Sequence, residues 1–144
     1  MTLADVNVLI YAFREDARYH APSYSWLTKT ADSGRQFCVS TLALAALVRI
    51  TTASTLADGR SAVAEAFAFC DALLARSNCL QVEPGARHWA IFQDLCKNAT
   101  LNGKRTTDAW YAALAIEHGC EWITLDRDFA RFPGLKWSPP TLPA

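Results

Sequence analysis

Short apolar runs alternate with longer amphipathic stretches along the 144 residues of the chain. The short runs predict strands at residues 2–5, 36–40, 79–83, 120–125 and 135–137. Between them, apolar residues recur at helical spacing, which predicts helices at residues 6–13, 16–30, 41–51, 59–76, 84–101 and 108–118. Because strands and helices alternate, the pattern is typical of an α/β fold in which crossover helices join parallel strands.

Two of the predicted helices carry an apolar face that we expect to be buried. In residues 59–76, this face consists of Val63, Phe67, Cys70 and Leu74. Pro84 occupies the position that proline prefers at a helix start, and the helix after it is expected to bury Trp89, Phe92 and Cys96. Both helices are therefore predicted to pack against the sheet.

Length and composition favour one globular domain over residues 1–144, with 51% hydrophobic and 19% charged residues. The five cysteines are odd in number and include no C-x-x-C pair, so we expect reduced thiols and a cytoplasmic protein. The apolar run near the start lacks both a basic leader and membrane-spanning length. The formal net charge is zero, so any surface that binds nucleic acid must be a local one.

Three aspartates fall at one edge of the predicted sheet. Asp5 and Asp126 each follow a strand, and Asp108 begins a helix that leads back into the sheet. The carboxyl ends of parallel strands are where open α/β sheets bind ligands. Carboxylates that converge there repel one another and stay ionised only if a cation joins them. Since this set contains neither His nor Cys, Mg²⁺ or Mn²⁺ is the cation that its oxygen ligands favour.

The expected chemistry of such a site is hydrolysis of a phosphodiester. Divalent ions among carboxylates can activate a water molecule and stabilise the charge that develops on a phosphate. Asn7, two residues after Asp5, could hold a water molecule or a phosphate oxygen. Thr124 could hydrogen-bond a carboxylate that holds the metal.

Each acid also has a purely structural interpretation. Asp108 could be only a helix cap or a partner of the helix dipole, and Asp126 and Asp128 could be ordinary turn residues on either side of Arg127. Asp5 is different, because an aspartate inside an apolar junction between strand and helix is costly as a structural residue. The metal site is thus predicted from the conjunction of the acids.

Three segments in this order carry a more specific signal, and they read Asp5-Val-Asn-Val-Leu-Ile-Tyr-Ala, Thr107-Asp-Ala-Trp-Tyr-Ala-Ala-Leu-Ala and Ile123-Thr-Leu-Asp-Arg-Asp-Phe. They resemble the motifs of PIN domains, and specifically of the VapC toxins of bacterial toxin–antitoxin pairs. The resemblance runs nearly end to end and includes the segment Phe132-Pro-Gly-Leu-Lys-Trp.

The resemblance implies an α/β/α sandwich with a mostly parallel sheet of about five strands. It also implies a Mg²⁺- or Mn²⁺-dependent endoribonuclease that cleaves cellular RNA, forms a homodimer and is inhibited by a cognate VapB-type antitoxin. By this resemblance the catalytic and metal-binding acids are Asp5, Asp108 and Asp126, with Asp128 as an auxiliary metal ligand. Further positions that the family uses around the site correspond to Asn7, Thr124 and Arg49.

One position departs from the family pattern. VapC toxins usually carry a glutamate three residues before an arginine in the helix after the second strand, and Ala46 stands at that distance from Arg49. Alanine supplies no ligand atom, so we expect a weakened second ion and slow hydrolysis. Two origins are open, a natural loss or a substitution introduced to silence a toxic enzyme.

Binding of RNA requires positive charge near the acids. Lys104 and Arg105 precede Asp108, Arg14 follows the first motif, and Arg127 and Arg131 flank the last one, although each could be an ordinary surface residue.

Three other functions account for parts of this pattern. A non-catalytic PIN-like module, which binds RNA or an antitoxin without cutting, is the main alternative because of Ala46. A haloacid-dehalogenase-like phosphatase fits less well, because it requires an acid where the chain has Asn7. A phosphoaspartate receiver requires acidic partners and a lysine at strand ends, which we do not find.

Overall fold

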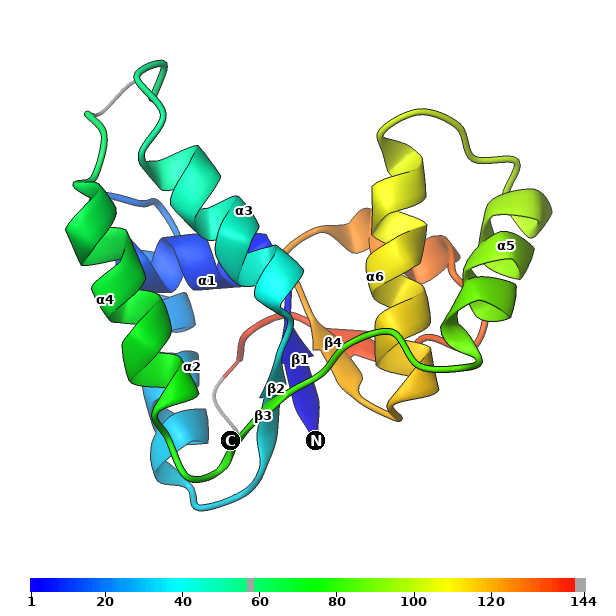
Figure 1. Cartoon of the computed structure of the whole chain (residues 1–144), viewed down its shortest axis with the longest axis horizontal. Coiled ribbons are helices and arrows are strands. Elements are labelled where there is room, and N and C mark those ends of the chain that lie inside the picture. Colours follow the sequence, from blue (N-terminus) through cyan, green and yellow to red (C-terminus); the bar gives the residue numbers. More distant parts are fainter. Residues whose placement is uncertain (57–58, 142–144) are drawn as a thin grey trace.

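The computed structural model of the chain, which describes residues 1–56 and 59–141, contains one sheet with helices on both faces (Figure 1). Its five strands are all parallel and follow the order β3-β2-β1-β4-β5. Their bounds are Thr2–Ala4 for β1, Phe37–Val39 for β2, Cys79–Gln81 for β3, Glu121–Ile123 for β4 and Trp137–Ser138 for β5. The predicted α/β class with about five mostly parallel strands is confirmed.

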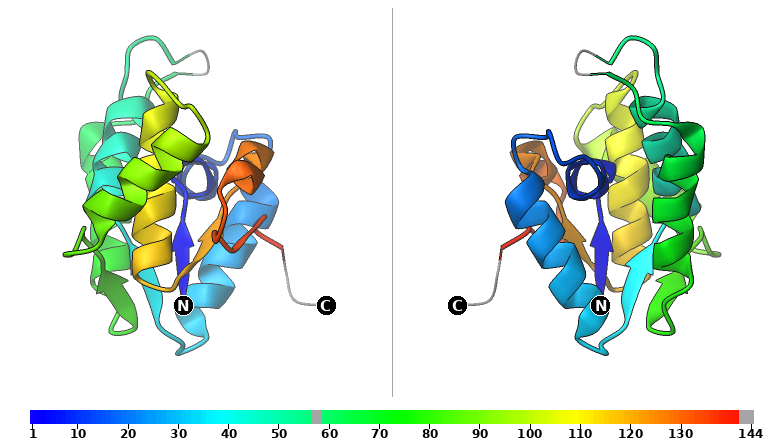
Figure 2. Two further views of the ribbon diagram at one scale, coloured as in Figure 1. Left: turned by 90° about the vertical axis from the view of Figure 1, so that its right-hand side faces the viewer. Right: turned by 90° about the vertical axis from the view of Figure 1, so that its left-hand side faces the viewer.

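The helices form two layers around this sheet. Figure 2 shows α3, α4, α5 and α6 on one face, and α2 with the short 3₁₀ helix η1 on the other, while α1 crosses above β1. The helix bounds are Val6–Phe13 for α1, His20–Asp32 for α2, Thr41–Thr51 for α3, Val63–Leu74 for α4, His88–Asn98 for α5, Arg105–Glu117 for α6 and Arg127–Arg131 for η1. The arrangement is the predicted α/β/α sandwich.

The position of β1 in the sheet brings the two ends of the sequence together. Leu3 of β1 pairs with Cys38 of β2 on one side and with Trp122 of β4 on the other. The backbone N–H of Asp5 continues the second pairing by donating to the carbonyl of Ile123 at 2.8 Å. The segments after β1 and β4 therefore leave the sheet side by side at its carboxyl edge.

The core lies between this sheet and α6. Leu3, Trp122 and Leu114 are completely buried, as are the alanines of α6 that face the sheet. Small side chains let a helix approach a sheet closely, so α6 is held rigidly with its first turn at the carboxyl edge.

Helix α5 begins later than its sequence predicts. Pro84 lies before the helix. In the segment that follows it, the N–H groups of Gly85 (2.6 Å) and Arg87 (2.9 Å) donate hydrogen bonds to the carboxylate of Glu117 in α6. A side chain at residue 85 would meet that carboxylate at 3.0 Å. The predicted buried face is also wrong for Trp89, whose surface is 65% exposed.

Helix α4 likewise buries a different face from the expected one. Of the predicted residues only Cys70 is buried, while Val63, Phe67 and Leu74 are exposed; Ala66 and Leu73 face the core instead. The helix packs beside α3 at the margin of the sheet, so a part of its apolar surface stays open.

All five cysteines lie in the described part of the chain and carry free thiols. The thiol of Cys120 donates to that of Cys38 at 3.6 Å, beneath the start of β1. None of the helices within residues 1–56 and 59–141 combines the length and apolarity that crossing a bilayer requires.

Candidate active site at the carboxyl edge of the sheet

Asp5 ends β1 and begins α1 through its backbone. Its carbonyl accepts hydrogen bonds from the N–H groups of Val8 and Leu9, so the main chain starts the helix while the side chain forms no capping bond. Asp5 is 7% exposed. Burial raises the pKa of this carboxyl to about 6, and the nearby Asp108 carboxylate adds to the rise. The Thr124 hydroxyl and the nearby N–H groups of Asn7 and Val6 lower the pKa.

Thr124 connects the first motif with the last one. It is completely buried, and its hydroxyl donates to a carboxylate oxygen of Asp5 at 2.6 Å. The same hydroxyl oxygen accepts hydrogen bonds from the backbone N–H of Asp126 at 3.0 Å and from the Asn7 amide at 3.4 Å. The amide oxygen of Asn7 is buried and has no hydrogen-bond partner among the described residues, which leaves one acceptor open beside Asp5.

Asp108 lies in the first turn of α6 but does not cap it. The helix begins at Arg105, and the residue in the cap position is Lys104. Burial raises the pKa of the Asp108 carboxyl, and the carboxylates of Asp126 and Asp128 act in the same direction. The guanidinium groups of Arg131 and Arg105 oppose them. The structural interpretation of Asp108 as a helix cap is therefore wrong, whereas its place in the first turn still suits a role as partner of the helix dipole.

Asp126 and Asp128 lie near Asp108, and each also has a structural role. The Asp126 carboxylate accepts the backbone N–H of Asp128 at 2.9 Å and so caps η1. Asp128 is exposed and pairs with Arg131 at 3.2 Å. The interpretation as turn residues thus holds for both acids, and it does not remove their charge from the neighbourhood of Asp108.

Asp5 and Asp108 share a cavity of 350 Å³ with residues of α3 and α6. The residues that line it are Asp5, Val6, Leu42, Ala45, Ala46, Arg49, Ile50, Thr107, Asp108 and Tyr111. Ala46 thus stands at the wall of the site without an oxygen atom to offer. Arg49, one turn further along α3, brings a positive charge to the same wall.

Sequence reasoning missed Tyr111 as a residue of this site. Its side chain is only 6% exposed, and burial together with the Asp5 carboxylate raises the pKa of its hydroxyl to about 12, against a smaller effect of Arg49. The signal was present, since residues three apart on a helix lie on the same face and Tyr111 follows Asp108 at that distance.

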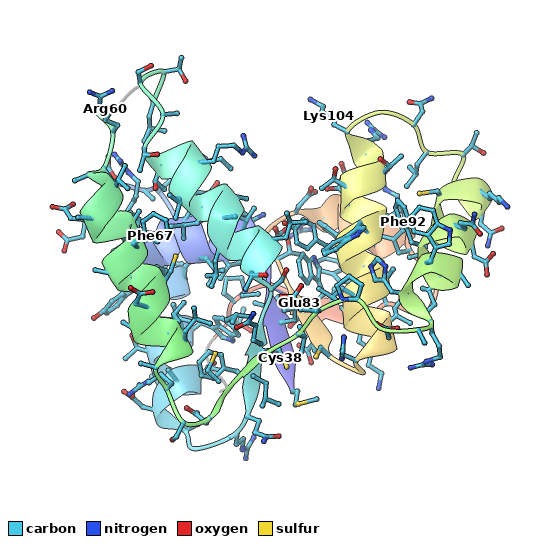
Figure 3. The ribbon with its side chains drawn as sticks, viewed as in Figure 1. Cys38, Arg60, Phe67, Glu83, Phe92 and Lys104 are labelled. Carbon is cyan, nitrogen blue, oxygen red and sulfur yellow. The ribbon has the colours of Figure 1, made fainter. Side chains whose placement is uncertain are left out.

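The other predicted cations divide into two groups. Arg105 and Arg131 are close enough to act on Asp108, and Lys104 stands at the top of α6 (Figure 3). Arg14 is engaged elsewhere: its guanidinium donates to both carboxylate oxygens of Asp16, at 2.9 and 2.6 Å, and to the Ser61 hydroxyl at 3.1 Å.

The donor set of this site suits a hard divalent cation. All four acids supply oxygen atoms, the ligands that Mg²⁺ and Mn²⁺ prefer, and Asp5 carries a carboxylate whose charge burial disfavours. Within residues 1–56 and 59–141, however, no three side chains of His, Cys, Asp or Glu already form a group that could hold a metal. The carboxylates would have to move inward around an ion.

Known proteins resemble this chain in sequence and in fold. The PIN domain family matches residues 2–135. The VapC ribonuclease Mb2897 of Mycobacterium bovis is 36% identical over 140 residues, which are 97% of this chain and 95% of that protein. Ribonuclease VapC25 of Mycobacterium tuberculosis is 38% identical over 136 residues, 94% of this chain and 96% of that one.

Solved structures agree at the level of the fold. The structure of VapBC2 from Rickettsia felis, bound to a DNA fragment from its promoter, includes a chain that superposes with a TM-score of 0.71 at 18% identity, covering 96% of this chain and 97% of that one. A chain of FitAB bound to a DNA fragment has a TM-score of 0.67 at 18% identity, with 97% and 95% covered. Taken with the sequence matches, these findings establish that the chain belongs to the PIN-domain family and, within it, to the VapC ribonucleases.

Proposed function

We propose that this chain is the toxin of a type II toxin–antitoxin system and that it hydrolyses RNA with Mg²⁺ or Mn²⁺ held by Asp5, Asp108 and Asp126, with Asp128 at the outer side. The observation that carries the proposal is the meeting of Asp5 and Asp108, from opposite ends of the sequence, in one 350 Å³ cavity. Burial raises the pKa of both carboxyl groups; Asp108 adds to the rise at Asp5, and Asp126 and Asp128 add to it at Asp108. A bound cation would offset this cost.

When bound, such an ion lowers the pKa of an attacking water molecule and offsets the charge that builds on the phosphate. The chain's own residues set the geometry. Thr124 orients the Asp5 carboxylate, and the open amide oxygen of Asn7 could accept a hydrogen bond from a water molecule. The Asp126 carboxylate is held by the backbone N–H of Asp128 in η1. Arg105 and Arg131 supply positive charge near Asp108 for the RNA backbone, and Lys104 lies at the end of the same helix.

Ala46 sets the expected level of activity. The wall of the cavity that it forms lacks a carboxylate, so the site holds fewer oxygen ligands than the family pattern provides. We infer that one ion binds more tightly than a second, and that this chain cleaves RNA slowly.

The test joins metal binding with RNA cleavage. Mn²⁺ titrated into the protein is expected to release heat and to raise the melting temperature, and RNA cleavage in Mn²⁺ is expected to stop on addition of EDTA. Asp108→Asn should lose the binding and the cleavage, whereas Asp94→Asn, an exposed residue of α5, should keep both. Cleavage that persists in Asp108→Asn or in EDTA contradicts the proposal.

A second function is favoured by Ala46 itself. A chain that binds RNA without cutting it would be a non-catalytic PIN-like module. Such a module would bind RNA in Mn²⁺ but would leave it uncleaved.

We also propose a cognate VapB-type antitoxin as partner. A groove of 310 Å³ lies between α3 and α4, and its apolar lining includes Leu44, Val48, Phe67 and Leu74. Phe67 and Leu74 are the residues that the periodicity of α4 marks as buried and that the chain leaves exposed. An apolar segment of an antitoxin would cover them.

The homodimer remains a proposal from the family resemblance. Light scattering is expected to give twice the chain's 15.9 kDa, and a mass of one chain at micromolar concentration contradicts it.

A further inference from the structure

Tyr111 is held in the active-site cavity by its ring and not by its hydroxyl. The ring stacks on Trp122 with centroids 5.5 Å apart and planes at 26°, and it meets the edge of Trp110 at 5.3 Å. Trp122 is completely buried in β4, so the stack rests on the sheet itself. The ring of Tyr111 thus has little freedom, and its hydroxyl has a defined position.

The hydroxyl is an unused hydrogen-bond donor. No residue within 1–56 or 59–141 forms a hydrogen bond with it, although the side chain is 94% buried and lines the cavity with Asp5 and Asp108. Its oxygen is not one of the fully buried side-chain atoms that lack a partner, so the hydroxyl keeps some accessible surface. A partner from outside the chain would satisfy it.

Arg49 faces the same space. It lies one turn after Ala46 on α3, and Ala46 provides no acid to pair with it. Among the described residues Arg49 forms no ion pair, and it is exposed toward solvent. Its charge reaches the Tyr111 hydroxyl, whose pKa it lowers.

The cavity therefore holds hydrogen-bond donors as well as acids. Asp5 and Asp108 contribute carboxylates, while Tyr111, one turn after Asp108 on α6, and Arg49 on α3 contribute donors, and Ala46 carries no carboxylate. An anion that entered would be repelled by the carboxylates and would accept hydrogen bonds from the donors.

We propose that Tyr111 is a substrate-binding residue, whose hydroxyl donates a hydrogen bond to a non-bridging oxygen of the RNA phosphate beside Arg49. This inference rests on the proposed ribonuclease function and assigns the phosphate a place within that site. The hydroxyl is a neutral donor, so it can bind the phosphate without adding a positive charge that would compete with the metal ion for the carboxylates. The Trp122 stack keeps the donor aligned before RNA arrives.

The experiment uses Tyr111→Phe, which removes the hydroxyl and keeps the ring. The binding of a fluorescent single-stranded RNA to the whole chain is measured by anisotropy in EDTA, where no cleavage occurs, and single-turnover cleavage is measured in Mn²⁺. Tyr24→Phe is the matched control, because Tyr24 is 53% exposed on α2 and does not line the cavity.

We expect Tyr111→Phe to weaken RNA binding roughly tenfold to a hundredfold, as the loss of one hydrogen bond to a charged acceptor does. Cleavage at subsaturating RNA should fall by at least the same factor, and the melting temperature should stay unchanged. Arg49→Gln should act in the same direction, and Tyr24→Phe should match the parent chain.

Two outcomes would overturn the inference, and they are distinguishable. If the parent chain binds and cleaves RNA and Tyr111→Phe does both equally well, only the role of Tyr111 is wrong. If the parent chain and Ala46→Glu neither bind nor cleave RNA, the ribonuclease function fails and the inference fails with it.

Discussion

Asp5 shows at the scale of one residue how this site is built. Its backbone completes the pairing of β1 with β4 and starts α1, so the side chain has no freedom to leave the junction. Its carboxylate is buried, and Thr124 is its one side-chain donor among the residues that the structure describes. The pKa of about 6 means that ionised Asp5 destabilises the folded chain at neutral pH until a cation arrives.

The sign of this effect is testable with Asp5→Asn in EDTA. Because the folded pKa of about 6 lies above the ordinary value of 3.8, folding favours protonated Asp5; that stabilisation is complete below pH ~4 and is lost as pH rises through 6. The difference of about two pKa units corresponds to at most about 3 kcal/mol. Urea denaturation should therefore find Asp5→Asn more stable than the parent at pH 7, with the gap closing toward pH 4.

The control for this effect is Asp94→Asn, which changes an exposed carboxylate in the same way. Equal stability of the parent and Asp5→Asn at pH 7 would contradict the burial of an ionised Asp5. So would a difference in stability between them that widens as the pH falls.

Single residues were predictable where chemistry and local sequence agree. Asp5 was predicted because it is an acid at the end of an apolar strand, and Thr124 because it lies close to another acid at a strand end. The structure contains a hydrogen bond between the two side chains. Tyr111 was not found, because an aromatic residue in an apolar helix is usually core and its ring does pack as core. Tyr111 also lines the cavity, and hydrophobic periodicity does not register its single polar atom.

At the scale of elements, α1 and α3 match their predicted bounds because their apolar faces meet the sheet or one another. The faces of α4 and α5 were predicted wrongly in part. Periodicity identifies an apolar face but does not say what covers it. Phe67 and Trp89 are exposed, and the described part of the chain places no further layer over them. Such faces are typical of surfaces that meet another molecule.

Phe67→Ser tests this interpretation of α4. Because half of the Phe67 surface is already exposed, we expect a loss of less than about 1 kcal/mol in unfolding free energy, while affinity for the co-expressed VapB-type antitoxin falls at least about tenfold. Calorimetric titration measures the affinity. Glu65→Ala, exposed on the same helix but outside the groove, should leave both quantities unchanged.

A loss of several kcal/mol in Phe67→Ser would show that Phe67 belongs to the core, and unchanged affinity would place the antitoxin on another surface.

At the scale of the whole molecule, the fold class followed from the alternation of strands and helices, but the site depends on the strand order. Only the pairing of β1 with β4 places Asp5 beside Thr124 and Asp126, and only the direction of α6 brings Asp108 to the same edge. Hydrophobic patterning does not encode which strands are neighbours, so the convergence of the acids had to come from their types and from the family resemblance.

In the function proposed above, acids from both ends of the chain form a metal-dependent RNA-cleaving site in which Ala46 leaves one ligand missing. The most direct measurement compares RNA cleavage in Mn²⁺ by the parent chain, by Ala46→Glu and by Ala46→Glu with Asp108→Asn. We predict that Ala46→Glu cleaves at least about tenfold faster than the parent, through one more oxygen ligand, and that Asp108→Asn abolishes this gain. Equal inactivity of the parent and Ala46→Glu, or cleavage that survives Asp108→Asn, would contradict the account.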